Sequence, residues 1–379
     1  MSEFDLIRRY FTRAAPSALL GVGDDAALLP VNEGNVLAVS TDMLVSGTHF
    51  LADADPFMLG HKTLAVNLSD MAAMGATPRW ATLAIALPDV DEVWLERFSA
   101  GFFTLADRYG VELVGGDTTR GPLNLCVTII GEVPVRQALL RGGARPDDEV
   151  WVSGKLGDAA LALAHLQNSI VLTADEYAAC APALHQPQPC VTLGQALRGI
   201  ASSAIDISDG LLGDLGHILE ASQVGAEIEF EALPVSAVLR TRLTPVSPPL
   251  SGGKLSSSPD KTTDMTTSHL TNPAEDAGQV IGYSHSTRPS KDDSQVAGYN
   301  KGRQGGVKLF QQFVLSGGDD YELCFTAPVK RHADISNIST RLGLPLTCIG
   351  KIVARRGCIV HDASGNLIDV EASGYDHFR

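Results

Sequence analysis

A stretch of 62 residues, 245–306, lacks the apolar side chains from which a folded core is built. Ser, Thr, Gly and Pro make up 30 of these residues, and none is Phe or Trp. Such a composition cannot bury enough apolar surface to offset the entropy lost when the chain becomes ordered. We therefore predict a disordered insertion at about 245–306, with a regulatory or partner-binding segment as the alternative. The rest of the 379-residue chain is long enough for about two domains.

The sequence on both sides of this insertion mixes patterns typical of strands and of helices. Runs rich in β-formers predict strands, and apolar residues at helical spacing predict helices. The expected strands lie at 36–41, 82–87, 123–133, 149–152, 204–207, 226–230, 322–326, 347–353 and 357–361, and the expected helices at 55–74, 91–109, 157–167, 211–222 and 333–342. No strict strand–helix–strand repeat is present, so we predict a two-domain α+β or mixed α/β protein. A turn at 145–148 separates domains at 1–143 and 144–379.

The chain is acidic, with 29 Lys and Arg against 44 Asp and Glu and a formal net charge of −15. This balance argues against a nucleic-acid binder, which normally has a basic surface. No apolar run approaches the roughly 18 residues that span a bilayer, and Glu3 and Asp5 stand where a signal peptide would be apolar. The six cysteines form no C-x-x-C pair, which favours reduced thiols in a cytoplasmic protein over disulfides or a zinc site.

Aspartate recurs beside Gly or Ser where predicted strands and helices end. The six instances are Gly23-Asp24-Asp25, Ser40-Thr41-Asp42, Ser69-Asp70, Gly115-Gly116-Asp117-Thr118-Thr119, Asp206-Ile207-Ser208-Asp209-Gly210 and Ser316-Gly317-Gly318-Asp319-Asp320. One such motif alone is an ordinary turn or cap, but carboxylates at several strand ends can converge on one crevice. Mg²⁺ takes oxygen ligands and bridges carboxylates to phosphate oxygens, and neighbouring glycines let backbone N–H groups approach a phosphate.

The standard nucleotide-binding signatures are absent from the sequence. No segment fits G-x-x-x-x-G-K-[ST], no H-R-D is followed by D-F-G, and Gly21-Val22-Gly23-Asp24 lacks the third glycine of a dinucleotide fingerprint. If the protein handles ATP, it does so by a carboxylate-rich route.

Seven motifs, taken in order, resemble the thiamine-monophosphate kinase family of the AIR-synthetase-like ATP-binding superfamily. They are GVGDDAALL (21–29), STDMLVSGTHF (40–50), KTLAVNLSDMAAMGATP (62–78), VGGDTTRG (114–121), DISDGLLGDLGHI (206–218), SGGDDYELCFT (316–326) and GYDHF (374–378). The resemblance implies an N-terminal sheet domain that dimerises and a C-terminal α+β domain. It also implies direct in-line transfer of the γ-phosphoryl group of ATP to thiamine monophosphate. The implied cofactor is Mg²⁺, as several ions, and a monovalent cation such as K⁺ commonly helps.

The resemblance assigns roles to the residues at matching positions. The implied metal ligands are Asp25, Ser40, Thr41, Asp42, Asp70, Asp117, Asp206 and Asp209, with Asp24 beside them. The implied ATP contacts are Tyr109, Gly116, Asp117, Arg141 and Ser208, and the implied substrate contacts are His49, Asp319 and Tyr375. The implied catalytic residues are Asp42, Asp70, Asp117 and Asp209. These roles agree with phosphoryl transfer, which needs charge neutralisation and alignment more than a covalent nucleophile.

Some of these positions also have ordinary structural interpretations. Taken alone, His49 is a capping or surface histidine, Arg141 a surface arginine and Tyr375 a packing tyrosine. Lys62 lies on the helix that carries Asp70, and we interpret it as a structural cation.

The chain departs from the family pattern in two places. Asp319 stands where the family usually has Glu, and its side chain is one methylene shorter. Contact with the pyrimidine end of the substrate is therefore expected to become water-mediated or to shift to Asp320. The second departure is the insertion, where the family has a short connection.

Other functions remain as alternatives. A selenophosphate synthetase needs a reactive Cys or selenocysteine near the N-terminal glycines, whereas the first cysteine here is Cys126. The hydrogenase-maturation enzyme needs a C-terminal cysteine, and this chain ends GYDHFR. AIR synthetase stays open on fold alone. A non-catalytic Mg·nucleotide-binding or metal-buffering protein is the alternative from another class.

Overall fold

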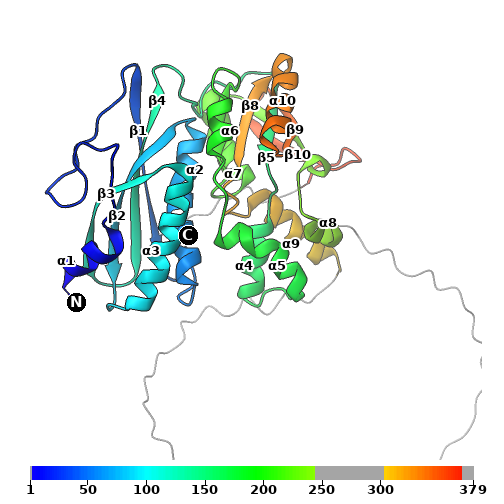
Figure 1. Cartoon of the computed structure of the whole chain (residues 1–379). Helices are drawn as coiled ribbons and strands as arrows, with labels where there is room; N and C mark the ends of the chain where they lie inside the picture. Colours follow the sequence, from blue (N-terminus) through cyan, green and yellow to red (C-terminus); the bar gives the residue numbers. More distant parts are fainter. Residues whose placement is uncertain (1, 244–302, 369–379) are drawn as a thin grey trace, which may run out of the picture. The chain divides into compact units, whose positions relative to one another are not determined.

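Residues 2–243 and 303–368 are described by the computed structural model, in which strands and helices alternate irregularly (Figure 1). The predicted insertion lies outside these residues, apart from 303–306, which begin helix α9 (Arg303–Ser316). The described residues on its two sides belong to one compact unit. The division into domains at 143/144 stays a prediction.

Four strands form the first sheet, in the order β1-β4-β2-β3. They are β1 (Asn35–Val45), β2 (Thr77–Leu87), β3 (Glu112–Arg120) and β4 (Asn124–Pro134), and a short helix α1 (Glu3–Leu6) and a π-helical turn (Ile7–Phe11) precede them. Strand β4 pairs antiparallel with β1 and β2, and β3 runs parallel to β2 at the edge. Alternate side chains of β1, among them Leu37, Val39 and Met43, are exposed. One face of this sheet therefore presents apolar side chains to solvent.

Two long helices, α2 (Pro56–Ala73) and α3 (Glu92–Tyr109), pack against each other beside this sheet (Figure 1). Asp55 caps α2 by accepting hydrogen bonds from the first two free N–H groups of the helix (3.0 and 3.2 Å), which confirms the predicted helix start. The two backbones touch because a Cβ on Gly60 would lie 2.0 Å from the carbonyl oxygen of Phe98. Helix α2 also contacts elements of the second half and is buried over most of its length.

Six strands form the second sheet, in the order β10-β7-β9-β5-β8-β6. They are β5 (Asp148–Ser153), β6 (Ser203–Asp206), β7 (Gly225–Glu229), β8 (Leu323–Pro328), β9 (Leu346–Val353) and β10 (Gly357–His361). The helices of this half are α4 (Asp158–Leu166), α5 (Ala174–His185), α6 (Val191–Ala196), α7 (Leu211–Ser222), α8 (Ala237–Leu243), α9 and α10 (His332–Leu342). Only β7 and β10 pair in parallel among the described neighbours. A buried apolar cluster that includes Leu68, Leu193 and Phe325 joins α2 to this second half.

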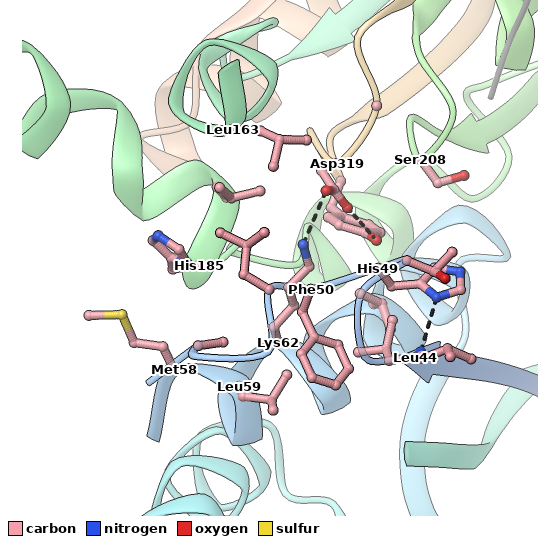
Figure 2. A pocket seen from close by; sticks show the side chains of 18 of the residues that line it. Leu44, His49, Phe50, Met58, Leu59, Lys62, Leu163, His185, Ser208 and Asp319 are labelled. Carbon is pink, nitrogen blue, oxygen red and sulfur yellow. Dashed lines mark hydrogen bonds and ion pairs between the residues drawn. The ribbon is translucent and has the colours of Figure 1, made fainter. Parts of the chain in front are cut away.

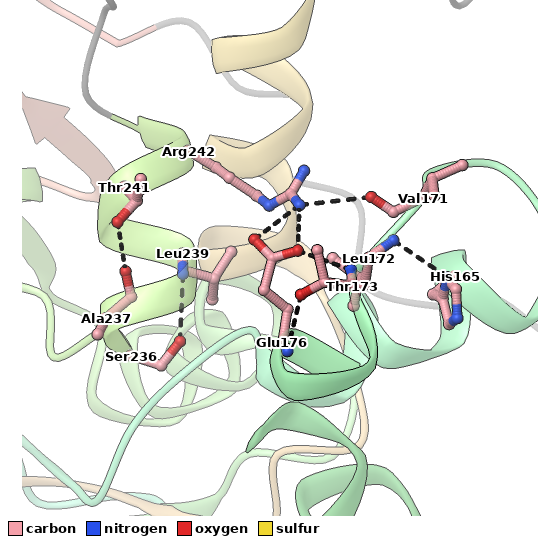
Figure 3. Close-up of polar contacts among 10 residues, drawn as sticks. All are labelled: His165, Val171, Leu172, Thr173, Glu176, Ser236, Ala237, Leu239, Thr241 and Arg242. Atoms are coloured by element: carbon pink, nitrogen blue, oxygen red, sulfur yellow. Dashed lines mark hydrogen bonds and ion pairs between the residues drawn. The ribbon is translucent and has the colours of Figure 1, made fainter. Parts of the chain in front are cut away.

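The helices on either side of the insertion are anchored to their neighbours. Figure 3 shows Arg242, near the end of α8, donating hydrogen bonds to both carboxylate oxygens of Glu176 in α5 (2.9 and 2.8 Å). The Arg242 guanidinium also lies 5.8 Å from the ring centre of Phe310 in α9. Leu239 and Val314 share a second buried apolar cluster. The chain therefore leaves and re-enters the described region at two helices that contact each other.

Each predicted strand and helix has a counterpart in the structure, but strand β3 and helices α1, α5, α6, α8 and α9 were not predicted. Strand β3 contains Gly115, Gly116 and Asp117, which disfavour strands, and pairing with β2 overrides that preference. Helix α5 contains Pro182, although it starts with a capping box formed by Thr173 and Glu176. All six cysteines are free in the structure. Among the helices of the described residues, none is long and apolar enough to cross a membrane.

Candidate active site

A cavity of about 1430 Å³ lies where the end of β1, helix α2 and the loops around β6 and β8 meet. Helices α4 and α5 close another side of it. Figure 2 shows apolar side chains such as Phe50, Leu59 and Leu163 surrounding a few charged groups. Small-molecule pockets usually enclose about 300–1,000 Å³. This cavity is therefore large enough for two ligands side by side.

Eight of the predicted site residues line this cavity. They are Thr41, Asp42, His49, Asp70, Asp206, Ser208, Asp209 and Asp319. Ser40 adjoins it, because its hydroxyl donates a hydrogen bond to Oδ2 of Asp70 (2.5 Å). Residues from four of the six aspartate motifs, at 40–42, 69–70, 206–210 and 316–320, therefore meet at this cavity.

Three of these carboxyl groups, Asp42, Asp70 and Asp206, influence one another. Burial, followed by the charges of Asp70 and Asp206, raises the pKa of Asp42 to about 7. Burial and the charge of Asp70 raise the pKa of Asp206 to about 7 as well. Burial also raises the pKa of Asp70, although the hydrogen bond from Ser40 acts in the opposite direction. A group of partly buried carboxylates that repel one another is a favourable environment for a cation.

The loop that follows β6 is held in place by the carboxylate of Asp214. Oδ2 of Asp214, in α7, accepts hydrogen bonds from the backbone N–H groups of Ser208 and Asp209 (3.0 Å each). Burial raises the pKa of Asp214 to about 7, even though these two hydrogen bonds lower it. The loop backbone is therefore fixed by α7, so the side chains of Ser208 and Asp209 remain at the cavity wall.

The ring of His49 is oriented by the backbone of its own loop. Its Nδ1 atom accepts a hydrogen bond from the N–H of Val45 (3.0 Å). In a neutral imidazole the proton must then reside on Nε2, which becomes a hydrogen-bond donor. His49 lines the cavity, so this donor suits an anionic group such as a phosphate.

Asp319 is held at the cavity wall by two partners. Its Oδ2 atom lies 3.1 Å from Nζ of Lys62, and its Oδ1 atom accepts a hydrogen bond from the Tyr321 hydroxyl (3.0 Å). Asp320 faces elsewhere, because its buried carboxylate accepts hydrogen bonds from the N–H of Gly157 at the start of α4 (2.9 and 3.0 Å). The expectation that a substrate contact shifts to Asp320 is therefore wrong.

The structure does not bring the remaining predicted residues into this cavity. Asp24 and Asp25 are exposed and contact each other, with the N–H of Asp25 donating to Oδ1 of Asp24 (2.9 Å). The Tyr109 hydroxyl donates to the carbonyl oxygen of Pro189 (2.9 Å). Arg141 is exposed, yet its charge lowers the pKa of Asp70 and of Asp206. Tyr375 lies outside the described residues.

Gly116 and Asp117 lie on β3, at the opposite edge of the first sheet from Asp42. Both are exposed, and two strands, β4 and β2, separate β3 from β1. At about 4.8 Å per strand, that places the backbone of β3 roughly 14 Å from β1. Gly116 has φ +151, and a Cβ there would lie 1.9 Å from the carbonyl oxygen of Leu83. Only glycine fits this position.

The donor set of the cavity suits a hard divalent cation, because it consists of carboxylate and hydroxyl oxygens. In the described part of the chain, no three His, Cys, Asp or Glu side chains are gathered closely enough to hold a metal ion by themselves. Mg²⁺ is usually bound by one or two carboxylates together with water and substrate phosphates. The residues present therefore fit a metal that arrives with a phosphate ligand.

Several cavity residues were not predicted from the sequence. Lys62 and Tyr321 contact Asp319, and apolar side chains of α4 and α5 form one wall. A signal for Lys62 was available, because it lies eight residues before Asp70 on the same helix. Residues spaced by four share one helix face. The interpretation of Lys62 as a purely structural cation omits its position in the cavity.

Comparisons with known proteins agree with this geometry. Residues 23–133 match the family model for AIR synthase related protein, N-terminal domain. Thiamine-monophosphate kinase from Escherichia coli is 42% identical over 382 residues, which cover 99% of this chain and 98% of that protein. The crystal structure of thiamine-monophosphate kinase from Stenotrophomonas maltophilia has a TM-score of 0.71 and 39% identity, and covers 96% of each chain.

Two further structures are similar to this chain. One, described as AaThiL complexed with AMPPCP and TMP, has a TM-score of 0.66 and 26% identity, and covers 99% of this chain and 96% of that one. Hydrogenase maturation protein HypE in complex with ATP has the same TM-score at 20% identity. The second likeness shows the fold alone.

Proposed function

Because this chain belongs to the thiamine-monophosphate kinase family, we propose that its cavity is where thiamine monophosphate accepts a phosphoryl group. The chain is an ATP-dependent kinase that converts thiamine monophosphate to thiamine diphosphate in thiamine biosynthesis. The observation that carries the assignment of the site is the convergence of Asp42, Asp70 and Asp206 on this cavity. Burial raises the pKa of all three, and the charge of Asp70 raises the pKa of Asp42 and Asp206 further. Both substrates are polyanions, so such carboxylates need cations to bind them.

Asp42, Asp70, Asp206 and Asp209 are the residues that would hold Mg²⁺, with Ser40 and Thr41 beside them. The metal, when bound, neutralises phosphate charge and aligns the two phosphates for in-line transfer. Ser40 is already hydrogen-bonded to Asp70 (2.5 Å), which fixes that carboxylate. Several Mg²⁺ ions, and a monovalent cation such as K⁺, complete the proposed cofactor set.

The acceptor phosphate is proposed to lie beside His49, whose Nε2–H is directed by the hydrogen bond at Nδ1. Asp319 lies on the other wall and is proposed to contact the pyrimidine ring. Tyr375, outside the described residues, stays a proposed substrate contact.

The proposed ATP contacts are Tyr109, Gly116, Asp117, Arg141 and Ser208. Ser208 is fixed by Asp214 (3.0 Å), and the charge of Arg141 acts on Asp70 and Asp206. The hydroxyl of Tyr109 is already bonded to Pro189, so its contact with a nucleotide would be made by the ring.

We further propose that the working enzyme is a homodimer. The exposed face of β1 carries apolar side chains, with Val39 61% and Met43 53% exposed. An apolar sheet face of this kind is typical of an interface. The separation of Asp25 and Asp117 from the cavity also supports a dimer, because a second copy could bring these carboxylates to the site. Light scattering with size exclusion should give twice the 40.0 kDa chain mass, and a monomer at micromolar concentration would refute the proposal.

A cytoplasmic location is proposed on the basis of the cysteines. All six are free in the structure. Thiols of this kind are typical of a reducing compartment. Alkylation of the protein purified without reductant should modify the accessible thiols, and a disulfide-linked product would contradict the assignment.

The proposed kinase activity is tested by measuring ADP release with and without thiamine monophosphate. A kinase forms ADP only when the acceptor is present, and one equivalent of thiamine diphosphate accompanies each ADP. Binding of Mg·ATP without turnover would favour the non-catalytic alternative. ADP formation that ignores the acceptor would identify an ATPase instead.

A further inference from the structure

One face of helix α2 lines the cavity. Met58, Lys62, Val66 and Asp70 all line the cavity and follow one another at intervals of four residues. Such residues share one helix face. Since the rise is about 1.5 Å per residue, the backbones of Lys62 and Asp70 are about 12 Å apart along the axis. Asp70 therefore lies on this helix face at the proposed metal site, and Lys62 lies about two helical turns before it.

The side chain of Lys62 is buried, with 5% of its surface exposed, and its ammonium lies 3.1 Å from Oδ2 of Asp319. Figure 2 shows this ammonium directed at the Asp319 carboxylate across the cavity. The Asp319 side chain keeps 28% of its surface exposed and lines the cavity. A ligand in the cavity can therefore contact the carboxylate of Asp319, whereas the ammonium of Lys62 is buried.

The backbone that carries Asp319 is held in an unfavourable conformation. Asp319 has φ +69 and Tyr321 has φ +50, a region that costs a non-glycine residue of order 1–3 kcal/mol. The N–H groups of Asp319 and Tyr321 donate to the carbonyl oxygens of Ser208 (2.9 Å) and Ile207 (2.7 Å). The Tyr321 hydroxyl then donates to Oδ1 of Asp319 (3.0 Å). These contacts aim the carboxylate at Lys62.

The wall around this pair is largely apolar. Figure 2 shows Phe50, Met58, Leu59 and Leu163 around it, and Leu166 and Leu184 also line the cavity. His185, Tyr177, Asp53 and Asp55 are further titratable side chains of the cavity lining, and the Tyr177 hydroxyl is hydrogen-bonded to Nε2 of His185 (3.0 Å). The carboxylate of Asp55 is engaged by the start of α2 and by Arg97 (2.5 Å). Burial and then the charge of Lys62 lower the pKa of His185, so its ring is neutral at pH 7.

We propose that Lys62 is a positioning residue that determines specificity for the pyrimidine ring of the acceptor, because it fixes the Asp319 carboxylate as the acceptor for the ring amino group. This inference rests on the proposed function of the cavity. The carboxylate of Asp319 is one methylene closer to its backbone than that of a glutamate, and Lys62 and Tyr321 hold it from two sides. The remaining lone pairs of the carboxylate face a ligand that brings N–H donors.

The pair also keeps the ring end of the cavity electrically neutral. Lys62 alone would repel the thiazolium ring of thiamine, and Asp319 alone would be a partly buried, unpaired charge. Together they offer a carboxylate for recognition without a net charge. Lys62 therefore acts through Asp319 and does not touch the transferred phosphoryl group.

The first test compares K62M with wild type in steady-state assays. We expect the KM for thiamine monophosphate to rise about 10-fold or more, while kcat and the KM for ATP stay within about threefold. The matched control is K351M, which removes an exposed lysine paired with Glu227 on the second sheet (3.4 Å) and leaves the cavity intact. K62R, which keeps the charge, should restore a large part of the affinity. If K62M does not fold, K62Q compared with K351Q gives the same comparison, because Gln also removes the charge and keeps a polar side chain beside Asp319.

The second test uses oxythiamine monophosphate, in which the ring amino group is replaced by an oxygen. Wild type should prefer thiamine monophosphate by about 100-fold in kcat/KM, since the analogue presents no amino donor to the carboxylate. The preference should fall to below about 10-fold in K62M and in D319N. The double variant K62M/D319N should be no worse than the poorer single variant, because the two side chains act as one unit.

These outcomes separate the inference from the proposed function. Wild-type turnover of thiamine monophosphate tests the function by itself. An unchanged KM and unchanged discrimination in K62M would overturn the role of Lys62 while leaving the kinase intact. An equal rise in the KM for thiamine monophosphate and in the KM for ATP would also overturn the role of Lys62, because Lys62 would then support the cavity as a whole. A purely structural lysine would lower the melting temperature without changing the preference between the two acceptors.

Discussion

The substitution Asp70→Asn should lower activity and raise the stability of the metal-free protein at the same time. Activity should fall at least about 100-fold, a loss of roughly 2.7 kcal/mol of transition-state stabilisation, because the variant loses a charge that cations need. Stability should rise because the charge of Asp70 raises the pKa of both Asp42 and Asp206 to about 7, second only to burial.

The size of the stability gain follows from these pKa values. A shift from 3.8 to about 7 corresponds to about 4 kcal/mol for one carboxyl group, and burial supplies the largest share of it. Because the charge of Asp70 ranks second to burial, the gain should be a minor part of this cost, on the order of 1 kcal/mol. A carboxyl group with a raised pKa in the folded state loses stability as the pH rises from about 4 to about 7. The gain should therefore be full at pH 8 and absent near pH 4.

The assay is chemical unfolding in EDTA at pH 8 and at pH 4.5, repeated at pH 8 with MgCl₂. Wild type should gain stability from the metal, and Asp70→Asn should gain less. Asp89→Asn is the control, because Asp89 is an exposed carboxylate paired only with Arg120 in the described structure (3.2 Å). The reasoning is refuted if Asp70→Asn is less stable than wild type in EDTA at pH 8, or if it keeps near-normal turnover.

Three further predictions concern other parts of the chain. Replacing His49 with Phe should raise the KM for thiamine monophosphate about 10-fold or more with little change in the KM for ATP, because the Nε2–H donor is lost; an equal change in both would contradict the assignment. Glu132→Gln should destabilise the protein by about 1 kcal/mol at pH 7: burial would raise the pKa of Glu132, but hydrogen bonds from Asn32 and Asn35 lower it overall. The difference should shrink as the pH falls and the carboxylate becomes protonated, and a difference that does not change with pH would exclude this cause. Replacing 245–301 with a short Gly-Ser linker should preserve activity, because the flanking helices contact each other through Arg242 and Phe310 and loop closure changes by only about 0.6 kcal/mol per doubling of length; a folded variant without turnover would show that the insertion has a working role.

Local sequence signals account for the elements that place the site. Asp55-Pro56 predicted the start of α2, and the N–H groups of its first turn are bonded to Asp55 as expected. Strand β3 was not predicted, because glycines such as Gly115 and Gly116 do not favour a strand. Its pairing with β2, a tertiary contact, decides its conformation.

The ligand set could be predicted only as a list of residues and not as an arrangement. Asp42, Asp70 and Asp206 come together because β1, α2 and β6 end at one cavity. Asp117 was placed in the same set, but the strand order puts it on the far edge of the first sheet. Lys62 was interpreted as structural because its partner, Asp319, is distant in the sequence, and no local pattern connects them.

The most direct test of the account is ³¹P NMR of one sample that contains the protein, ATP and thiamine monophosphate, first with EDTA and then with excess MgCl₂. We expect no change in EDTA, since the carboxylates cannot hold the phosphates without a cation. After MgCl₂ is added, the γ-phosphate signal of ATP should disappear as the diphosphate signals of thiamine diphosphate grow in equal amount. Transfer at full rate in EDTA, or release of inorganic phosphate in place of thiamine diphosphate, would contradict the account.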